Sequence, residues 1–365
     1  MEKLRVAVIF GGKSGEHEVS IASAASIFKH LDPQRYDALP IKIEKDGRWV
    51  LAGEAPKAIS AADVHKQVGG PSTPSPGVGL QPIDPTTTLA AGSIDVVFPV
   101  LHGPFGEDGT VQGLLELANV PYVGAGVLGS AVGMDKAVMK TLFLARNLPV
   151  APYAVVLRPE WTRNAAAVTR RIEAELRFPV FVKPANLGSS VGISKAKDAA
   201  QFHDAMDLAL QYDRKIVVEA AVPNAREIEC AVLGNDDPQA SVAGEIIPLR
   251  EFYDYEAKYM DANGSRLEIP AAISPDQTED IRRMSIEAFR ACDLSGLARV
   301  DFLMARDTGE IFLNEVNTLP GFTTISMYPK LWEASGVGYG ELLDRLIALA
   351  LERHREKQQL RTSFT

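Results

Sequence analysis

Cysteine is scarce in this 365-residue chain, and long apolar runs are missing. The two cysteines, Cys230 and Cys292, lie far apart without the spacing of metal ligands. This argues against a disulfide framework and predicts small core residues in a reducing compartment. No apolar run approaches the ~18 residues that a membrane-spanning helix needs, and no signal-peptide pattern is present. We therefore expect a cytoplasmic protein with no membrane partner.

Positive charge is not in excess either. The chain has 38 Lys and Arg against 47 Asp and Glu, a formal net charge of −9, and no basic cluster. This balance argues against nucleic acid as a partner. An apolar content of 46% and a charged content of 23% are ordinary for a globular protein, and the length allows two or three domains.

Two common nucleotide-binding signatures are also missing. The segment 11–16 follows an expected strand at 4–10 and opens an expected helix at 18–31, but it fails the Gly-x-Gly-x-x-Gly spacing. The loop after Lys183 lacks the Gly-Lys-Ser/Thr order of a Walker A loop. The failed glycine spacing argues against a nucleotide-linked oxidoreductase. Glu16 could mark an amine site or could only stabilise the start of the helix.

The order of expected elements predicts an α/β protein in three parts. Residues 1–125 are typical of an open domain with parallel strands, which we expect over 4–10, 38–43 and 95–101. Within this domain, residues 52–92 are rich in Gly, Pro, Ser, Thr and Ala. They predict a surface excursion with little regular structure apart from a short turn of helix.

The other two parts are residues 126–221 and 222–365. The first contains a strand that ends at Lys183, a Gly/Ser-rich loop and a helix over 198–211. The second is rich in strands and ends in an amphipathic helix. The apolar positions of this helix are Leu342, Leu343, Leu346, Ile347 and Leu349.

An expected hairpin near the C-terminal end carries most information about function. Its strands span 297–304 and 311–317, and a three-residue turn at 307–309 provides Gly where a left-handed residue is needed. Period-two alternation places Arg299 and Asp301 together on one face of the first strand.

The returning strand places Glu315 opposite Asp301 and Asn317 opposite Arg299. Like charges directly opposite each other destabilise a sheet. A hard cation between them removes this penalty, and carboxylate and amide oxygens are the ligands that Mg²⁺ prefers. Two alternatives stay open: a solvated polar face, and a one-residue slip that would turn one carboxylate away.

Lysines and small residues elsewhere suggest a phosphate site. The loop from Lys183 to Gly192 would let backbone N–H groups close on an anion, although an ordinary hairpin turn is the alternative. Lys136 and Lys258 are further candidates, but a single Lys is usually a surface group. Lys258 lies in a polar aromatic stretch, 251–259, of the kind that forms lids.

Polar residues also follow two buried strands. His102 lies at the carboxyl end of the third expected strand, the usual location of function in open α/β sheets. Asp108 is expected to cap a helix over 110–118 instead. Glu219 ends an apolar strand and Glu227 follows a turn that contains proline, a hinge at which an adenine edge and a ribose could bind.

Six segments together resemble the D-alanine–D-alanine ligases of the ATP-grasp superfamily along nearly the whole chain. They are Gly11-Gly12-x-Ser14-x-Glu16-His17-x-x-Ser20, His102-Gly-x-x-Gly-Glu-Asp-Gly109, Lys183-Pro184 with Gly188-Ser189-Ser190-x-Gly192, Tyr253 to Tyr259, Arg299-x-Asp301-Phe302, and Glu315-x-Asn317-Thr-x-Pro-Gly321. The resemblance implies an ATP-grasp fold, in which two ATP-grasp subdomains follow the N-terminal domain. It also implies ATP-dependent joining of two D-alanines through an acyl phosphate, for peptidoglycan synthesis, by a homodimer.

The resemblance also implies roles for nucleotide and metal contacts. The ATP phosphates would contact Lys136, Lys183, Lys258 and the backbone of Ser190. The adenine and ribose would lie at Glu219 and Glu227. Two Mg²⁺ or Mn²⁺ ions would bind Asp301, Glu315 and Asn317.

The remaining roles concern the two amino acids. By resemblance, Glu16 would hold the ammonium of the first D-alanine, supported by His102, Ser189 and Tyr259. Ser326 would hold the carboxylate of the second, next to Met327, where many relatives have Leu. The tetrahedral oxyanion needs preorganised donors, and we expect Arg299 and the backbone N–H of Gly321 to supply them.

Overall fold

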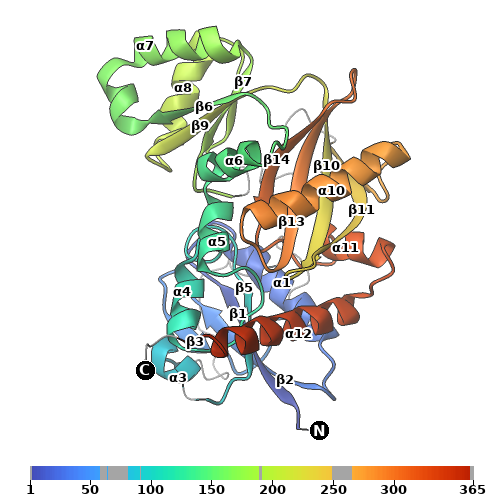
Figure 1. Ribbon diagram of the computed structural model, residues 1–365. Coiled ribbons are helices and arrows are strands. Elements are labelled where there is room, and N and C mark those ends of the chain that lie inside the picture. Colours follow the sequence, from blue (N-terminus) through green and yellow to red (C-terminus); the bar gives the residue numbers. More distant parts are fainter. Residues whose placement is uncertain are drawn as a thin grey trace.

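The computed structural model describes residues 2–57, 64, 81–90, 92–188, 191–248 and 265–361. The described residues form three β-sheets, and Figure 1 shows them in separate parts of the molecule. Each sheet lies within one of the predicted parts, 1–125, 126–221 and 222–365, and this agreement supports those boundaries, which stay a prediction. None of the helices in the described ranges is both long and apolar enough to cross a membrane.

The N-terminal sheet has the strand order β4-β3-β2-β1-β5. Its strands are β1 (Leu4–Gly11), β2 (Tyr36–Ile43), β3 (Trp49–Leu51), β4 (Gln81–Pro82) and β5 (Val96–Val100). As predicted, β1, β2 and β5 are parallel, and β1 is buried on both faces, which is typical of parallel strands. The antiparallel strands β3 and β4, which extend the sheet beyond β2, were not predicted.

Among the described residues, the helices α1 (His17–His30), α3 (Pro85–Ala90) and α4 (Thr110–Leu117) accompany this sheet. The expected helix over 18–31 is confirmed by α1. In the described part of the 52–92 excursion, the named elements are the two-residue strand β4 and the six-residue helix α3. The buried side chain of Leu89 anchors α3 to the core.

The central sheet is antiparallel, with the order β6-β9-β7-β8. Its elements are β6 (Tyr153–Leu157), α7 (Arg158–Leu176), β7 (Val180–Pro184), β8 (Ser194–Ala196), α8 (Ala199–Ala209) and β9 (Lys215–Ala220). Both helices pack on the sheet around one apolar cluster that includes Val182 and Phe202. The Asp198 side chain accepts a hydrogen bond from the Gln201 N–H and so begins α8.

The third sheet is also antiparallel, with the order β12-β11-β10-β13-β14. Its elements are β10 (Ala225–Gly234), β11 (Gln239–Pro248), β12 (Ser265–Glu268), α10 (Pro275–Ala291), β13 (Gly296–Ala305), β14 (Ile311–Asn317), α11 (Met327–Ala334) and α12 (Tyr339–Gln358). One face of this sheet packs on α10. The other face packs on α11 and α12 at one end and is polar at the other.

The β13–β14 hairpin confirms the predicted pairs but not the predicted turn. The turn has four residues, Arg306 to Gly309, because Ala305 and Glu310 still pair through their backbones. Gly309 has the expected left-handed backbone, with φ +74°. The prediction of a three-residue turn at 307–309 was therefore wrong by one residue.

A β-bulge compensates for the extra residue in the turn and restores the predicted register. The register shifts by one between Asp301 and Phe302, and Asn314 is the extra residue of β14. Beyond the bulge, Asp301 pairs with Glu315 and Arg299 pairs with Asn317, as the sequence predicted.

Helices α5 (Val127–Met134) and α6 (Lys136–Ala145) lead from the N-terminal sheet to the other two. Asp135 caps α6 by accepting hydrogen bonds from the N–H groups of Ala137 and Val138, each at 3.1 Å. Figure 1 shows α6 between the central and third sheets. Ala137 packs on the central sheet, whereas Met139 packs in the core of the third.

Helix α12 joins the third part of the chain to the first. Its apolar positions Leu342, Leu343, Leu346 and Ile347 are buried in the same cluster as Val6 and Phe98 of the N-terminal sheet. The predicted amphipathic helix is thus confirmed, and its apolar face packs on both the N-terminal sheet and the third sheet.

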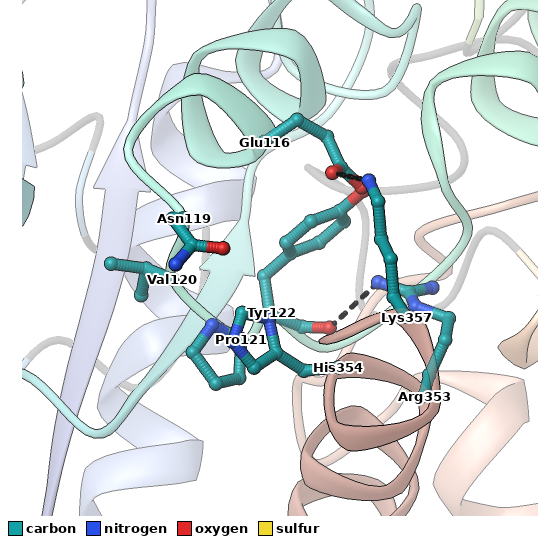
Figure 2. Close-up of a pocket in the computed structure, with 8 residues that line it drawn as sticks. All are labelled: Glu116, Asn119, Val120, Pro121, Tyr122, Arg353, His354 and Lys357. Carbon is teal, nitrogen blue, oxygen red and sulfur yellow. Dashed lines mark hydrogen bonds and ion pairs between the residues drawn. The ribbon is translucent and has the colours of Figure 1, made fainter. Parts of the chain in front are cut away.

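The last turns of α12 fasten this contact with polar groups. A cavity of about 60 Å³ lies there. Figure 2 shows Arg353 and Lys357 of α12 facing Tyr122 and Glu116 across it. The Arg353 guanidinium lies 4.5 Å from the centre of the Tyr122 ring and donates to the carbonyls of Tyr122, at 3.1 Å, and Gly124. Lys357 forms an ion pair with Glu116.

Arg353→Ala should lower the free energy of unfolding by about 2 kcal/mol, because two carbonyls lose a charged donor and the ring loses its cation. Urea denaturation would measure this change. Arg355→Ala is the matched control, since within the described ranges the Arg355 side chain bonds only to Leu351 of its own helix. It should change stability by less than about 0.5 kcal/mol. Equal losses in the two variants would contradict the role of Arg353.

Candidate active site

Three predicted segments meet at the carboxyl ends of β1 and β5. The Ser14 hydroxyl donates to the His102 carbonyl at 2.6 Å. The His102 ring Nδ1 lies 3.0 Å from the carbonyl oxygen of Leu319, in the loop after β14. The 11–16 segment, the His102 segment and the loop to Gly321 therefore lie together, as function at this sheet edge requires.

His102 presents a buried acceptor to this site. Because the Leu319 carbonyl can only accept, Nδ1 carries the proton. Burial lowers the pKa of His102 and favours the neutral ring. Its Nε2 is then a lone-pair acceptor, and no partner for it exists among the described residues. A donor on a ligand would satisfy this atom.

Two carboxylates lie under the loop that follows β7. A Cβ added at Gly188 would be 3.2 Å from Glu16 Oε2 and 3.7 Å from Glu107 Oε1. Glu107 also accepts a hydrogen bond from the Gly103 N–H at 2.7 Å. Burial, and after it the nearby Glu16 carboxylate, raise the pKa of Glu107 to about 8. Sequence reasoning missed Glu107, since a Glu-Asp pair before a helix is typical of capping.

The capping prediction for Asp108 needs a correction. The N-cap of α4 is Gly109, which has φ +93°, a backbone that favours glycine. Asp108 lies one residue earlier and accepts from the N–H groups of Thr110 at 3.0 Å and Phe105 at 2.8 Å. It still stabilises the start of the helix and holds the loop after His102.

A buried cluster of lysines surrounds Glu219. Its carboxylate lies 2.7 Å from Lys183 Nζ and 3.2 Å from Lys140 Nζ. Burial alone would raise the pKa of Glu219, but the two ammonium groups outweigh it, and the pKa is lowered. Sequence reasoning missed Lys140. The available signal was a lysine one helical turn after Lys136, on a face that is otherwise apolar.

The bulge residue Asn314 helps to hold this cluster. Its carbonyl accepts from Lys140 Nζ at 3.1 Å, and its side-chain oxygen accepts from Lys183 Nζ at 3.2 Å. The extra residue of β14 thus connects the third sheet to the lysines of α6 and β7.

The facing carboxylates of the hairpin are each neutralised by a cation. Arg299 contacts both oxygens of Asp301 at 2.7 Å, and the Asn317 side chain donates to Asp301 at 2.9 Å. Glu315 lies 3.1 Å from Lys136 Nζ. Burial opposes the charge on Lys136, but Glu315 and other nearby carboxylates raise its pKa.

These residues fit a hard divalent cation by their chemistry. Asp301, Glu315 and Asn317 supply carboxylate and amide oxygens from adjacent strand positions. No group of three or more His, Cys, Asp and Glu side chains occurs in metal-binding proximity in the described part of the chain. A metal site here therefore depends on oxygen donors of mixed type.

Other predicted residues lie on the same loops and strands. Glu227 is opposite Leu303 in β13. Ser326 accepts from the Thr323 N–H at 3.0 Å, and a Cβ added at Gly321 would lie 2.8 Å from its hydroxyl. Met327 begins α11 with its side chain in the core, so only its backbone is open to a ligand. Four predicted residues lie outside the described ranges: Ser189, Ser190, Lys258 and Tyr259.

Comparison with known proteins identifies the family. The family model described as "D-ala D-ala ligase N-terminus" matches residues 5–125, and the model described as "D-ala D-ala ligase C-terminus" matches residues 142–348. The chain belongs to the D-alanine–D-alanine ligase family. Similar family members include D-alanine–D-alanine ligases of Heliobacterium modesticaldum, 54% identical over 98% of each chain, and Geobacillus thermodenitrificans, 52% identical over 99% of each.

Solved ligases share the fold. The D-alanine–D-alanine ligase from Coxiella burnetii is 39% identical with a TM-score of 0.81, covering 98% of this chain and 97% of its own. The VanG D-Ala:D-Ser ligase from Enterococcus faecalis is 34% identical with a TM-score of 0.81, covering 96% of this chain and 100% of its own. The predicted D-alanine–D-alanine ligase resemblance and ATP-grasp fold are confirmed.

The raised pKa of Glu107 predicts a pH dependence of stability in this ligase. Because the folded chain keeps this proton to about pH 8 and the unfolded chain loses it near 4.5, folding takes up a proton in that window. Stability should fall as pH rises through it, by at most ~1.4 kcal/mol per pH unit. Urea denaturation between pH 5 and 8 should show a flatter profile for Glu107→Gln.

Glu310→Gln is the control, since Glu310 is exposed on the hairpin tip. This variant should keep the wild-type slope. Identical slopes for wild type and Glu107→Gln would show that Glu107 is ionised in the folded protein across the whole range.

Proposed function

We propose a division of labour among these residues for the reaction of the family, the ATP-dependent joining of two D-alanines. This reaction releases ADP and phosphate and makes a precursor of peptidoglycan. The position of Lys136 carries the proposal. Its Nζ lies 2.8 Å from the Leu187 carbonyl, in the loop after β7, and 3.1 Å from Glu315. Lys136 therefore connects the loop proposed to bind phosphate with the hairpin proposed to bind the metal.

The first step activates a carboxylate. Because a carboxylate is a poor acyl donor, one oxygen of the first D-alanine attacks the γ-phosphorus of ATP. The bond from that phosphorus to the bridging oxygen breaks, and ADP leaves. Lys136 and Lys183 offset the phosphate charge, with Lys140 holding Lys183 in place through Glu219. By resemblance, Lys258, Ser190 and Glu227 complete the nucleotide contacts.

Asp301, Glu315 and Asn317 would hold Mg²⁺ or Mn²⁺. When bound, such an ion would act as a Lewis acid toward the phosphoryl oxygens. In its absence, Arg299 and Lys136 neutralise the same two carboxylates. The repulsion between the two facing carboxylates is therefore reduced even before a ligand binds.

The second step forms the peptide bond. The first step leaves an acyl phosphate. The amine of the second D-alanine attacks its acyl carbon and loses one proton, and the tetrahedral oxyanion collapses with loss of inorganic phosphate. Arg299 and the Gly321 N–H stabilise this oxyanion; losing one such donor typically costs ~10²–10³ in rate. A Cβ at Gly321 would lie 2.8 Å from Ser326 Oγ, so a larger residue there would displace the Ser326 hydroxyl.

The two amino acids occupy different parts of the site. Glu16 takes the ammonium of the first, beside the lone-pair acceptor of His102, and Ser189 and Tyr259 support it by resemblance. The carboxylate of the second lies at Ser326 and the first N–H of α11, where the helix dipole favours an anion.

Location and assembly belong to the same proposal. Scarce cysteine supports a cytoplasmic location, and the family resemblance supports a homodimer. Light scattering should then give a mass near twice 39.5 kDa, whereas a value near 39.5 kDa itself would reject the dimer.

Phosphate release from ATP tests the reaction. D-alanine should stimulate release in the presence of Mg²⁺, whereas L-alanine and D-lactate should not. D-serine belongs in the same assay with D-alanine, since the VanG structure is that of a D-Ala:D-Ser ligase. Mass spectrometry of the products would separate the two dipeptides. An enzyme that D-alanine fails to stimulate would overturn the proposed substrate.

Glu315→Gln should raise the Mg²⁺ concentration needed for half-maximal rate and lower kcat by at least ~10-fold, since one of two carboxylates is lost. Steady-state rates at varied Mg²⁺ would measure both. Glu310→Gln in the same hairpin is the control and should behave as wild type. Unchanged metal dependence in Glu315→Gln would place the metal elsewhere.

A further inference from the structure

Glu229 is a buried carboxylate that the proposed reaction does not use. It lies in β10 directly opposite Asp301 of β13, and only 5% of its surface is exposed. A Glu is seldom buried without strong pairing. Its Oε2 lies 2.9 Å from Arg299 Nε, so it forms an ion pair with the proposed oxyanion donor.

Arg299 therefore lies between two carboxylates on neighbouring strands. Asp301 binds the guanidinium through both oxygens, each at 2.7 Å. Glu229 approaches the same guanidinium from the next strand. All three side chains share the polar face of the third sheet, whereas Val300 and Cys230 lie in the core on the other face.

The two carboxylates are not equivalent. Asp301 faces Glu315 across the hairpin and is the proposed metal ligand. A divalent cation at Asp301 and the guanidinium compete for the same oxygens and repel each other. Glu229 lies on the far side of β13 from Glu315, in the strand order β10-β13-β14, and so keeps its hold on Arg299 when Asp301 turns to the metal.

We propose that Glu229 is a positioning residue that retains the Arg299 guanidinium in the active site while Asp301 binds the divalent cation. This inference rests on the proposed metal site. It assigns Glu229 two effects that both act through Arg299. Glu229 draws the guanidinium away from Asp301, which favours metal binding, and it holds the guanidinium where the oxyanion forms.

Glu229→Gln tests the first effect without turnover. Calorimetric titration of MnCl₂ into the full-length protein with ADP should show about 10–100-fold weaker binding, the range for residues that orient metal ligands. Arg299→Ala should bind Mn²⁺ at least as tightly as wild type, because the competitor is gone. The double variant should match Arg299→Ala. A Glu229→Gln protein with wild-type Mn²⁺ affinity would overturn the inference.

The same four proteins test the second effect. Glu229→Gln should lower kcat about 10–100-fold with a much smaller change in the KM for D-alanine. In the Arg299→Ala background the same substitution should cause no further loss, since residues that act through one group are not additive. Independent, additive losses in kcat would mean that Glu229 does not act through Arg299.

Glu245→Gln is the matched control. Glu245 is 4% exposed in the neighbouring strand β11 and pairs with Arg226, at 2.9 and 2.5 Å, on the opposite face of the sheet. This variant loses a buried Glu–Arg pair of the same sheet, so it should lower thermal stability but keep the Mn²⁺ affinity. An equal loss of Mn²⁺ affinity in Glu245→Gln would reduce Glu229 to a structural residue.

Two outcomes separate this inference from the proposed function. If wild type and Glu315→Gln bind Mn²⁺ equally, the metal site itself is wrong. If Glu315→Gln loses Mn²⁺ and Glu229→Gln does not, only the role of Glu229 is wrong.

Should Glu229→Gln fail to fold, Glu229→Asp keeps the charge but shortens its reach. It should then weaken Mn²⁺ binding only where Arg299 is present, and wild-type affinity would contradict the inference.

Discussion

Pairing of buried charges between separate elements is the interaction on which this structure depends. Glu219 of β9 is held by Lys140 of α6 and Lys183 of β7, and Glu315 of β14 is held by Lys136 of α6. Removing one partner of a buried pair leaves an uncompensated charge and costs far more than the pair contributes. The central sheet, α6 and the third sheet are therefore fixed relative to one another by groups that also form the candidate active site.

The N-terminal sheet is joined to this assembly by three different kinds of contact. Apolar side chains of α12 share a core with β1 and β5, and the end of α12 adds the stacking of Arg353 on Tyr122. At the site itself, the contact is the hydrogen bond between His102 and the Leu319 carbonyl. The residues proposed to bind D-alanine in the first part thus lie next to those proposed to bind phosphate in the other two. The loop after β14, which connects them, depends on the whole fold for its position.

The family shows how this arrangement serves one reaction, and the local geometry shows what each strand position contributes. The polar face of the third sheet carries Glu229, Arg299 and Asp301 on neighbouring strands, so one guanidinium has two acidic neighbours. Farther along the same face, Leu233 and Leu297 are apolar and pack on the N-terminal part. A single sheet therefore supplies both a charged site and an interdomain core, and period-two alternation keeps most of the α10 side apolar.

Several features follow from the sequence alone, because they depend on local pattern. Apolar runs predict the parallel strands β1, β2 and β5, helical spacing predicts α1 and α12, and alternation predicts the shared face of Arg299 and Asp301. The pairing of Asp301 with Glu315 was also predicted, although the turn was one residue too short and the bulge at Asn314 made up the difference. Tertiary structure alone decided the partners of Lys140, Glu107 and Glu229. Lys140 meets Asn314 across 174 residues, and Glu107 owes its raised pKa to burial beside Glu16. Burial and charge neighbours arise only when distant segments pack, and no spacing within one segment encodes them.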